Sequence, residues 1–166
     1  MANVRFINPN TLAHQTGYSY VVETMGPGRT VYIAGQLGLD MANKLVGAPG
    51  DFRAQAIKAI ENLEAALASV GADLSDVVKI TNYLTDMSSH IGIYREVRDQ
   101  FFKMPRPAST AVGISELARP GALFEIEAIA VLPPAKAARP AKARGATRTA
   151  KAKAKAKTMT ARKKRK

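Results

Sequence analysis

Phe124-Glu125-Ile126-Glu127-Ala128-Ile129-Ala130-Val131 alternates in character from one residue to the next. Successive side chains of a β-strand point to opposite faces of a sheet, so this stretch predicts a strand with two unlike faces. The first face is wholly apolar and carries Phe124, Ile126, Ala128 and Ala130. The second carries Glu125, Glu127, Ile129 and Val131. We expect the first face to lie against a hydrophobic core, whereas Ile129 and Val131 on the second favour cover by a partner subunit.

Residues 51–71 predict a helix that supplies part of this core. Asp51 is a residue type that caps helix N-termini, and Gly71 is the type that most often follows a helix C-terminus. Between them, apolar residues recur on one helical stripe at Ala56, Ile60, Leu63, Leu67 and Val70. This spacing predicts an amphipathic helix of about five turns.

The remaining elements follow from turn residues and apolar runs. Residues 18–24 and 30–35 are rich in strand-forming residues, and the turn composition of residues 25–29 predicts that they form a hairpin. The pattern further predicts a loop at 38–50, a mostly buried strand at 77–84, a helix at 89–102, a strand at 108–114 and a turn at 118–121. This order predicts an α+β fold, with two helices on one face of a mixed sheet.

The net charge of +12 is unevenly distributed along the 166 residues. Residues 1–133 contain 11 Lys or Arg against 13 Asp or Glu, a net charge of −2. Residues 134–166 contain 14 Lys or Arg and no acidic residue, a net charge of +14. The second segment has too few large apolar residues to offset the entropy of ordering. We therefore expect a folded domain at 1–133 and a disordered basic tail at 134–166.

The tail has the composition of a nonspecific nucleic-acid-binding segment, similar to the lysine- and alanine-rich tails of linker histones. Its expected phosphate-binding residues are Lys151, Lys153, Lys155, Lys157, Arg162, Lys163, Lys164, Arg165 and Lys166. Displacement of counterions from phosphates predicts salt-sensitive binding to DNA or RNA, and without aromatic residues no base stacking is expected. The alternative is a tail that only keeps the protein soluble or contacts acidic partners. The alternating Lys-Ala run disfavours a membrane-surface helix.

Several classes of site are disfavoured by composition. The chain has no cysteine, which excludes disulfides and thiolate chemistry, and its two histidines, His14 and His90, are too few for a dedicated metal site. No cofactor is expected. The first residues lack a secretory signal pattern, and no apolar run is long enough to span a membrane. We expect a cytoplasmic protein, which the tail can hold at the nucleoid.

Three segments together closely resemble the Rid family, also called YjgF and, in older usage, L-PSP endoribonuclease. They are Val31–Gln36, Asp76–Met87 and Glu125–Val131, and the similarity runs from about Tyr18 to Val131. The resemblance implies a chorismate-mutase-like α+β fold and a homotrimer with three small-molecule clefts, each lined by two subunits. Active members of the family hydrolyse reactive enamines and imines to 2-keto acids and ammonia.

The resemblance also implies site residues. Glu125 matches the acid that orients the hydrolytic water, Gly35 matches a glycine that brings backbone close to the ligand, and Tyr18 matches an aromatic residue at the cleft wall. We interpret Glu127, two residues beyond Glu125, as structural. Ser109 has no histidine near it in sequence, so a nucleophilic serine triad is disfavoured.

The sequence departs from the family at the residue that grips the substrate carboxylate. The family has an arginine directly after Pro-Ala, whereas this chain reads Pro107-Ala108-Ser109-Thr110. A hydroxyl cannot replace a charged, two-pronged anchor, which places the chain in an arginine-lacking branch. Arg106 and Arg119 are candidates to compensate, but each is out of place in the sequence. We expect a pocket that prefers a neutral or cationic ligand.

Two classes of function stay open from the sequence. In the first, the domain is a hydrolase of C=N bonds in which Glu125 orients water, with its usual deaminase activity put in doubt by Ser109. In the second, it is a non-enzymatic module that binds a metabolite or acts as a nucleic-acid-associated scaffold for three basic tails. RNA cleavage is disfavoured, because no suitable acid–base pair is visible.

Overall fold

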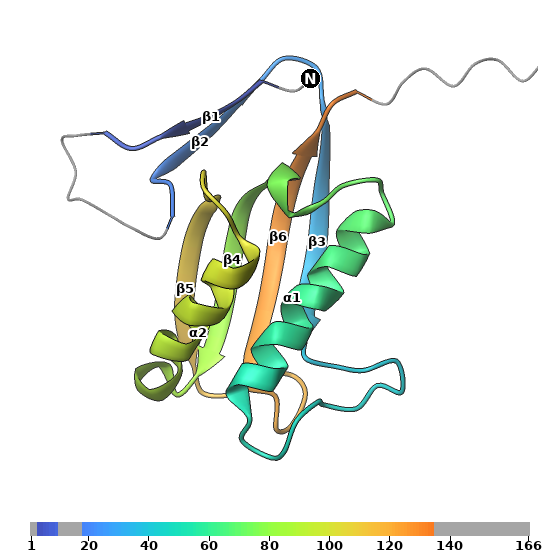
Figure 1. The fold of residues 1–166 in the computed structure, drawn as a ribbon, viewed down its shortest axis with the longest axis vertical. Coiled ribbons are helices and arrows are strands. Elements are labelled where there is room, and N and C mark those ends of the chain that lie inside the picture. Colours follow the sequence, from blue (N-terminus) through green and yellow to red (C-terminus); the bar gives the residue numbers. More distant parts are fainter. Residues whose placement is uncertain (1–2, 10–17, 135–166) are drawn as a thin grey trace, which may run out of the picture. The chain divides into compact units, whose positions relative to one another are not determined.

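A computed structural model describes residues 3–9 and 18–134 of the chain. Its main element is a four-stranded mixed sheet in the order β3-β6-β4-β5, formed by β3 (Arg29–Leu37), β4 (Val77–Thr85), β5 (Ala108–Ile114) and β6 (Phe124–Leu132). Strand β6 pairs antiparallel with β3 and β4, and β4 pairs parallel with β5. Helices α1 (Phe52–Ala68) and α2 (Met87–Phe101) both cover the same face of this sheet (Figure 1). The predicted α+β fold is confirmed.

Helix α1 begins at the predicted cap, Asp51, and ends earlier than predicted, at Ala68 with Ser69 as its C-cap. The Asp51 carboxylate accepts a hydrogen bond of 2.9 Å from the backbone N–H of Ala54, which satisfies a donor that has no partner within the helix. Gly71 adopts a positive φ of 74°, which reverses the chain after the helix. The predicted stripe is fully buried at Ala56, Ile60, Leu63 and Leu67. Val70 lies beyond the helix and is 36% exposed, so it does not belong to the stripe.

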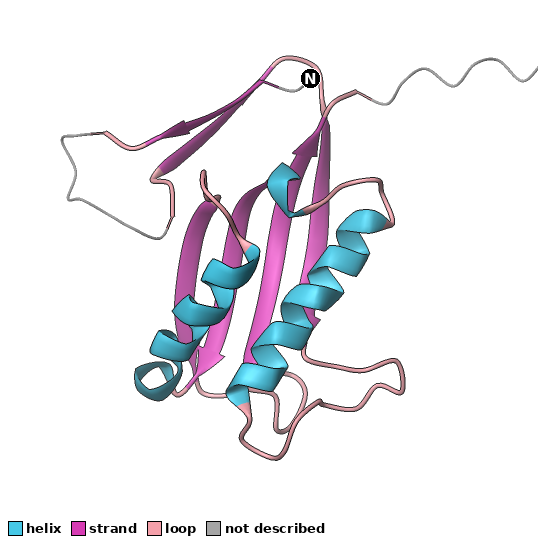
Figure 2. Ribbon diagram, in the orientation of Figure 1, coloured by secondary structure: helices cyan, strands magenta, loops and turns pink. Residues whose placement is uncertain are grey.

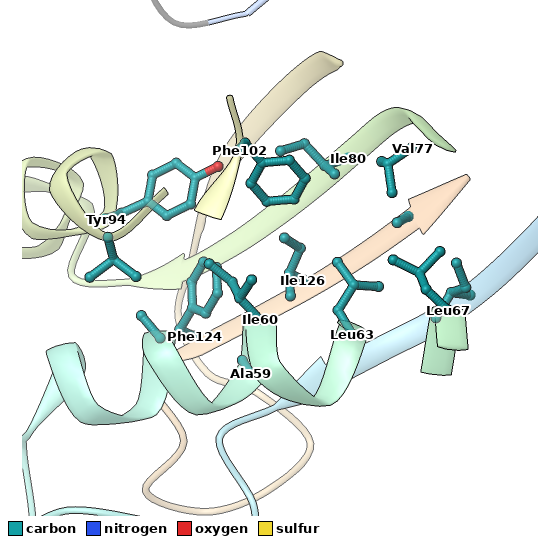
Figure 3. Packing of buried hydrophobic residues seen from close by; sticks show 14 of the residues in the cluster. Ala59, Ile60, Leu63, Leu67, Val77, Ile80, Tyr94, Phe102, Phe124 and Ile126 are labelled. Carbon is teal, nitrogen blue, oxygen red and sulfur yellow. The ribbon is translucent and has the colours of Figure 1, made fainter. Parts of the chain in front are cut away.

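The core lies between the helices and one face of the sheet (Figure 3). On β6 the predicted face Phe124, Ile126, Ala128 and Ala130 is buried, while the residues between them are only half-buried. The Phe124 ring packs against Tyr94 of α2 and Phe52 of α1, with centroids 5.4 and 5.7 Å apart. One face of the sheet therefore packs in the core, and the opposite face does not contribute to it.

Strand β4 is less buried than its composition predicts. Only its alternate residues, including Ile80, Asn82 and Leu84, are buried towards the helices. Lys79, Thr81 and Tyr83 are half-buried and lie on the opposite face. The prediction of a mostly buried strand was therefore wrong for one of its two faces.

The predicted hairpin between residues 18–24 and 30–35 was also wrong. Strand β2 (Val21–Met25) pairs antiparallel with β1 (Asn3–Ile7), which sequence reasoning did not identify, and the two form a separate two-stranded sheet. Gly26, at a positive φ of 82°, makes the expected turn, but the chain then enters β3 of the larger sheet. Turn composition marks where the chain bends and does not specify which strands pair. Here the strands on either side of the turn lie in two separate sheets (Figure 2).

Within residues 3–9 and 18–134, no helix has both the length and the apolar character needed to cross a bilayer. The predicted basic tail and His14 lie outside the described residues.

Candidate functional site

The sheet face opposite the helices carries a cluster of polar and ionisable side chains. Its members include Tyr32, Lys79, Thr81, Tyr83, Glu125 and Glu127. A hollow of about 400 Å³ opens on this face, lined chiefly by Tyr32, Lys79, Thr81, Glu127 and Ile129. Tyr32 is 77% exposed at its edge. We call this side of the sheet the open face, because both helices lie on the other side (Figure 2).

Gly35 and Glu125 are in direct contact on the open face. The pairing of β3 with β6 shifts register between Ile33 and Gln36, and Gly35 lies within this irregularity. A Cβ atom placed on Gly35 would lie 1.7 Å from Oε1 of Glu125. A side chain at position 35 would therefore require the Glu125 side chain to move. Two residues that the family resemblance singles out therefore form one structural unit.

The electrostatic surroundings of Glu125 favour its protonated form. Burial raises the pKa of this carboxyl, and the nearby charge of Glu127 raises it further. Tyr83 donates a hydrogen bond of 3.4 Å to Oε1 of Glu127. Burial and the two carboxylates likewise raise the pKa of the Tyr83 phenol. A carboxyl with a raised pKa can both accept and return a proton, as a general acid–base group must.

Lys79 is a functional candidate that sequence reasoning missed. Its Nζ donates hydrogen bonds of 2.8 Å to the backbone oxygen of Ile80 and to Oγ1 of Thr110. Burial lowers the pKa of this amine, and the charge of Glu127 partly opposes the shift. The signal was present in the sequence, because Lys79, Thr81 and Tyr83 alternate with apolar or buried positions along β4.

Ser109, which is in register with the buried residue Ile80 of β4, faces the helices. Its Oγ accepts a hydrogen bond of 3.3 Å from Nδ2 of Asn82, which is fully buried and also donates to the backbone oxygen of Thr110 at 2.9 Å. Tyr94 of α2 is buried nearby, and burial raises the pKa of its phenol to about 12. The hydroxyl is therefore part of the layer between sheet and helices.

Tyr18 is brought close to the segment that precedes Ser109. The backbone N–H of Ser19 donates to the oxygen of Pro107 at 3.2 Å, and the Ser19 hydroxyl donates to the oxygen of Arg106 at 2.7 Å. The Tyr18 ring lies edge-on to Tyr20, with centroids 5.5 Å apart. These two hydrogen bonds bring together segments that are almost ninety positions apart in the sequence.

The four predicted ligand and catalytic residues form two pairs within one chain. Glu125 is in register with Tyr83, whereas Ser109 is in register with Ile80, so the two lie two strands and three residues apart. Strand spacings place them about 14 Å from each other, on opposite faces of the sheet. Gly35 and Glu125 form one pair, and Tyr18 and Ser109 belong to the other. Within one chain, Glu125 and Ser109 therefore do not face a common space.

The other candidates from the sequence are used structurally. Arg106 bonds Asp99 at 3.0 Å and the backbone oxygen of Phe102 at 3.2 Å, and Arg119 donates to the backbone oxygen of Asn43 at 2.9 Å. His90 stacks on Phe52, with centroids 4.2 Å apart. Among the described residues, no three or more His, Cys, Asp and Glu side chains gather as a metal site would require.

Comparison with known proteins identifies the family. Residues 9–132 match the family described as Endoribonuclease L-PSP. A 2-iminobutanoate/2-iminopropanoate deaminase of Mus musculus is 40% identical over 118 residues, covering 70% of this chain and 82% of the mouse protein. A protein of the same description from Dermatophagoides farinae is 36% identical over 116 residues, covering 69% of this chain and 85% of its own. The structure of YyfB from Yersinia pestis, a Rid-family protein of unknown function, aligns at 35% identity with a TM-score of 0.72.

That alignment covers 78% of this chain and 99% of YyfB. The family match spans most of the described residues, and it includes both the Gly35–Glu125 pair and Ser109. The chain therefore belongs to the Endoribonuclease L-PSP family, also known as the Rid or YjgF family.

Proposed function

We propose that the protein is a homotrimer whose clefts, each formed between two subunits, hydrolyse C=N bonds of small enamines or imines. The observation that carries this proposal is the Gly35–Glu125 contact, in which a glycine makes room for a carboxyl of raised pKa on an open sheet face. The names of the relatives from Mus musculus and Dermatophagoides farinae support the same reaction class. A hydrolase of this class needs a positioned water and a proton-transfer group.

The division of the site into two pairs supports assembly between subunits. In our proposal, Gly35 and Glu125 of one subunit face Tyr18 and Ser109 of a neighbour across the cleft. Ile129 and Val131 are half-buried apolar side chains on the open face, and contact with a neighbouring subunit would bury them further. Size-exclusion chromatography with light scattering tests the assembly, and a monomer at micromolar concentration contradicts it.

Glu125 acts on the water in this reaction. Water adds to the C=N carbon while the nitrogen is protonated, and collapse of the adduct releases ammonia and leaves a carbonyl group. Glu125 accepts a proton from the attacking water and returns one to the departing nitrogen. The raised pKa of this carboxyl lies closer to neutral pH than that of an ordinary glutamate, so proton transfer in both directions is more efficient.

The substrate should lack a free carboxylate, because Ser109 replaces the anchoring arginine. The Ser109 hydroxyl carries no charge and offers a single O–H donor, whereas a guanidinium grips a carboxylate with two charged N–H bonds. Loss of charge-assisted hydrogen bonds of this kind costs about 1.5–3 kcal/mol, or roughly 10- to 100-fold in rate. We therefore place the chain in an arginine-lacking branch with altered substrate preference.

Paired substrates test this proposal. The rates of hydrolysis of 2-iminobutyrate and of its methyl ester are compared with buffer alone. We expect the wild-type protein to favour the ester, and Ser109→Arg to gain about 10- to 100-fold on the free acid. Glu125→Gln should abolish both activities. Ser115→Arg and Glu116→Gln, which change exposed residues of the same types, are the matched controls.

The same assay decides between the two classes of function. If wild type, Ser109→Arg and buffer hydrolyse both compounds at the same rate, the hydrolase proposal is wrong. The alternative is then a non-enzymatic module that binds a metabolite or scaffolds basic tails. The observation that favours it is the Asn82–Ser109 hydrogen bond, which commits Ser109 to a structural contact.

We further propose that residues 134–166 tether the protein to DNA or RNA without sequence preference, and so hold it near the nucleoid. Fourteen positive charges and no acidic residue support this role. Replacing Arg162, Lys163, Lys164, Arg165 and Lys166 together by Gln should weaken DNA binding and flatten its salt dependence. Arg53→Gln on the folded domain, the control, should leave both unchanged. Equal loss from the two variants contradicts the assignment.

A further inference from the structure

A second hollow, of about 180 Å³, shares no lining residue with the hollow on the open face. Its lining comes from β1, the short 3₁₀ helix η1 (Leu74–Asp76), the start of β4, the end of α2 and the connection from α2 to β5. The lining residues are Phe6, Leu74, Ser75, Val77, Phe101, Phe102, Lys103, Met104, Pro105 and Pro107. The second hollow is therefore separate from the open face and from the Gly35–Glu125 pair.

The second hollow leads from the surface towards the hydrophobic core. Val77 and Phe102 are at most 2% exposed and belong to the core cluster (Figure 3). Leu74 and Phe101 are half-buried and pack against that cluster. Met104 is 70% exposed and lies at the outer edge of the lining. A ligand that enters beside Met104 would exchange water for aromatic and aliphatic surface, which is favourable.

The size and lining of the second hollow suit one aromatic ring. Apolar cavities of about 150 Å³ in proteins bind benzene. Eight of the ten lining residues are apolar, and three of these are Phe6, Phe101 and Phe102. Phenylalanine rings favour edge-on or offset contact with another aromatic ring. The lining therefore favours a single aromatic ring over a polar or extended ligand.

A positive charge lies beside this apolar surface. Lys103 is the sole ionisable residue among those that line the second hollow. Its Nζ donates to the backbone oxygens of Gln100 and Asp99, at 2.8 and 3.3 Å. An ammonium group has three N–H bonds, so one remains for a ligand. The two backbone bonds restrain the charge near the end of α2, where it would attract an acidic substituent on the ring.

We propose that the second hollow binds a small aromatic acid, with its ring among Phe6, Phe101 and Phe102 and its carboxylate at Lys103. This inference goes beyond the hydrolase proposal and does not depend on it. It needs neither Glu125 nor a cleft between subunits, because every lining residue belongs to one chain.

Fluorine NMR tests the proposal on the full-length protein in about 0.15 M salt. The probes are 4-fluorophenylacetate and its neutral amide, 4-fluorophenylacetamide, which share a ring and differ in charge. We expect the acid to bind about two- to fivefold more tightly than the amide, as for a solvent-exposed ion pair. Lys103→Gln should remove this preference and leave the affinity for the amide unchanged. Lys44→Gln, a change at another exposed lysine, should keep the preference.

A second pair of variants locates the bound ring. Ser75→Phe introduces a ring into the lining and should abolish binding of both probes, whereas Ser115→Phe, at an exposed serine elsewhere, should not. Equal affinities of wild type for the two probes overturn the proposal. Binding that survives Ser75→Phe also overturns it, since another surface would then hold the probe. If Ser75→Phe does not fold, the two lysine variants still decide the outcome.

Glu125→Gln separates this inference from the hydrolase proposal. The variant should stop imine hydrolysis and leave the affinity for both probes unchanged, because Glu125 does not line the second hollow. Loss of probe binding in Glu125→Gln would place the aromatic acid in the candidate cleft and overturn the inference.

Discussion

The two faces of the β3-β6-β4-β5 sheet are built from the same strands and differ in almost every other respect. On the helix face, Phe124 and Ile126 of β6 are completely buried against α1 and α2. On the open face, Glu125 and Glu127 of the same strand are half-buried beside Lys79 and Tyr83. The comparison shows that neighbouring residues of one strand serve different roles. One contributes to the packing of the core, and the next belongs to the polar cluster on the open face.

The largest expected effect comes from breaking the helix face. Phe124→Ala removes a fully buried ring that packs against Tyr94 and Phe52, and should cost about 3–5 kcal/mol of unfolding free energy. Ile129→Ala, on the open face of the same strand, should cost less than half as much. Urea unfolding monitored by circular dichroism measures both. Equal losses would mean that the open face is as tightly packed as the core.

The next effect comes from the contact between Gly35 and Glu125. Gly35→Ala places a methyl group where the Glu125 carboxylate lies, so the carboxylate must move. We expect a loss of about 1–2 kcal/mol. In a Glu125→Ala background the same substitution should cost much less, because the obstructing atoms are gone. A double-mutant cycle of unfolding free energies measures this coupling, and additive losses would contradict it.

The cap of the helix that covers the core should matter less. Asp51→Ala removes the acceptor of the Ala54 N–H and should cost about 1 kcal/mol. Glu64→Ala, an exposed change on the same helix, should stay within about 0.5 kcal/mol of wild type. Thermal unfolding of the two variants checks this difference, and a neutral Asp51→Ala would show that the cap contributes nothing.

The smallest effect depends on pH and distinguishes carboxyls in different surroundings. The pKa of Glu125 is raised, so the folded chain holds this proton more tightly, and the resulting stability is lost as pH rises through the folded pKa. Glu125→Gln should therefore gain stability relative to wild type as pH rises above 4.5, the usual pKa of this carboxyl. Hydrogen bonds from Ser89 and Ser88 lower the pKa of Asp86, so Asp86→Asn should lose relative stability as pH rises. If the relative stabilities of the two variants change with pH in the same direction, the opposite pKa shifts of Glu125 and Asp86 are wrong.

Local patterns in the sequence predicted the helix face well. The α1 stripe and the alternation of β6 each depend on residues close together in the chain, and burial follows their period directly. The pairing of β2 was predicted wrongly, because it depends on β1, whose short sequence carries little signal. Which strands pair is decided by contacts between distant residues.

The open face was only partly predictable for the same reason. Glu125 and Gly35 were identified through the family resemblance, but their contact arises from the register shift between β3 and β6. Lys79 was overlooked because its neighbours along the sequence do not show which polar side chains surround it. Its neighbours Thr110 and Glu127 come from two other strands, and only the assembled sheet brings them together.

The contact between Gly35 and Glu125 also restricts the order in which this protein can change over evolutionary time. Any side chain gained first at position 35 collides with the carboxylate, so most such variants begin with a disadvantage. Shortening residue 125 first leaves a small void, which a later methyl group at position 35 can fill. One order of the two substitutions is therefore easier than the other, and a lineage that lost the acid and then gained the side chain could not readily regain the acid.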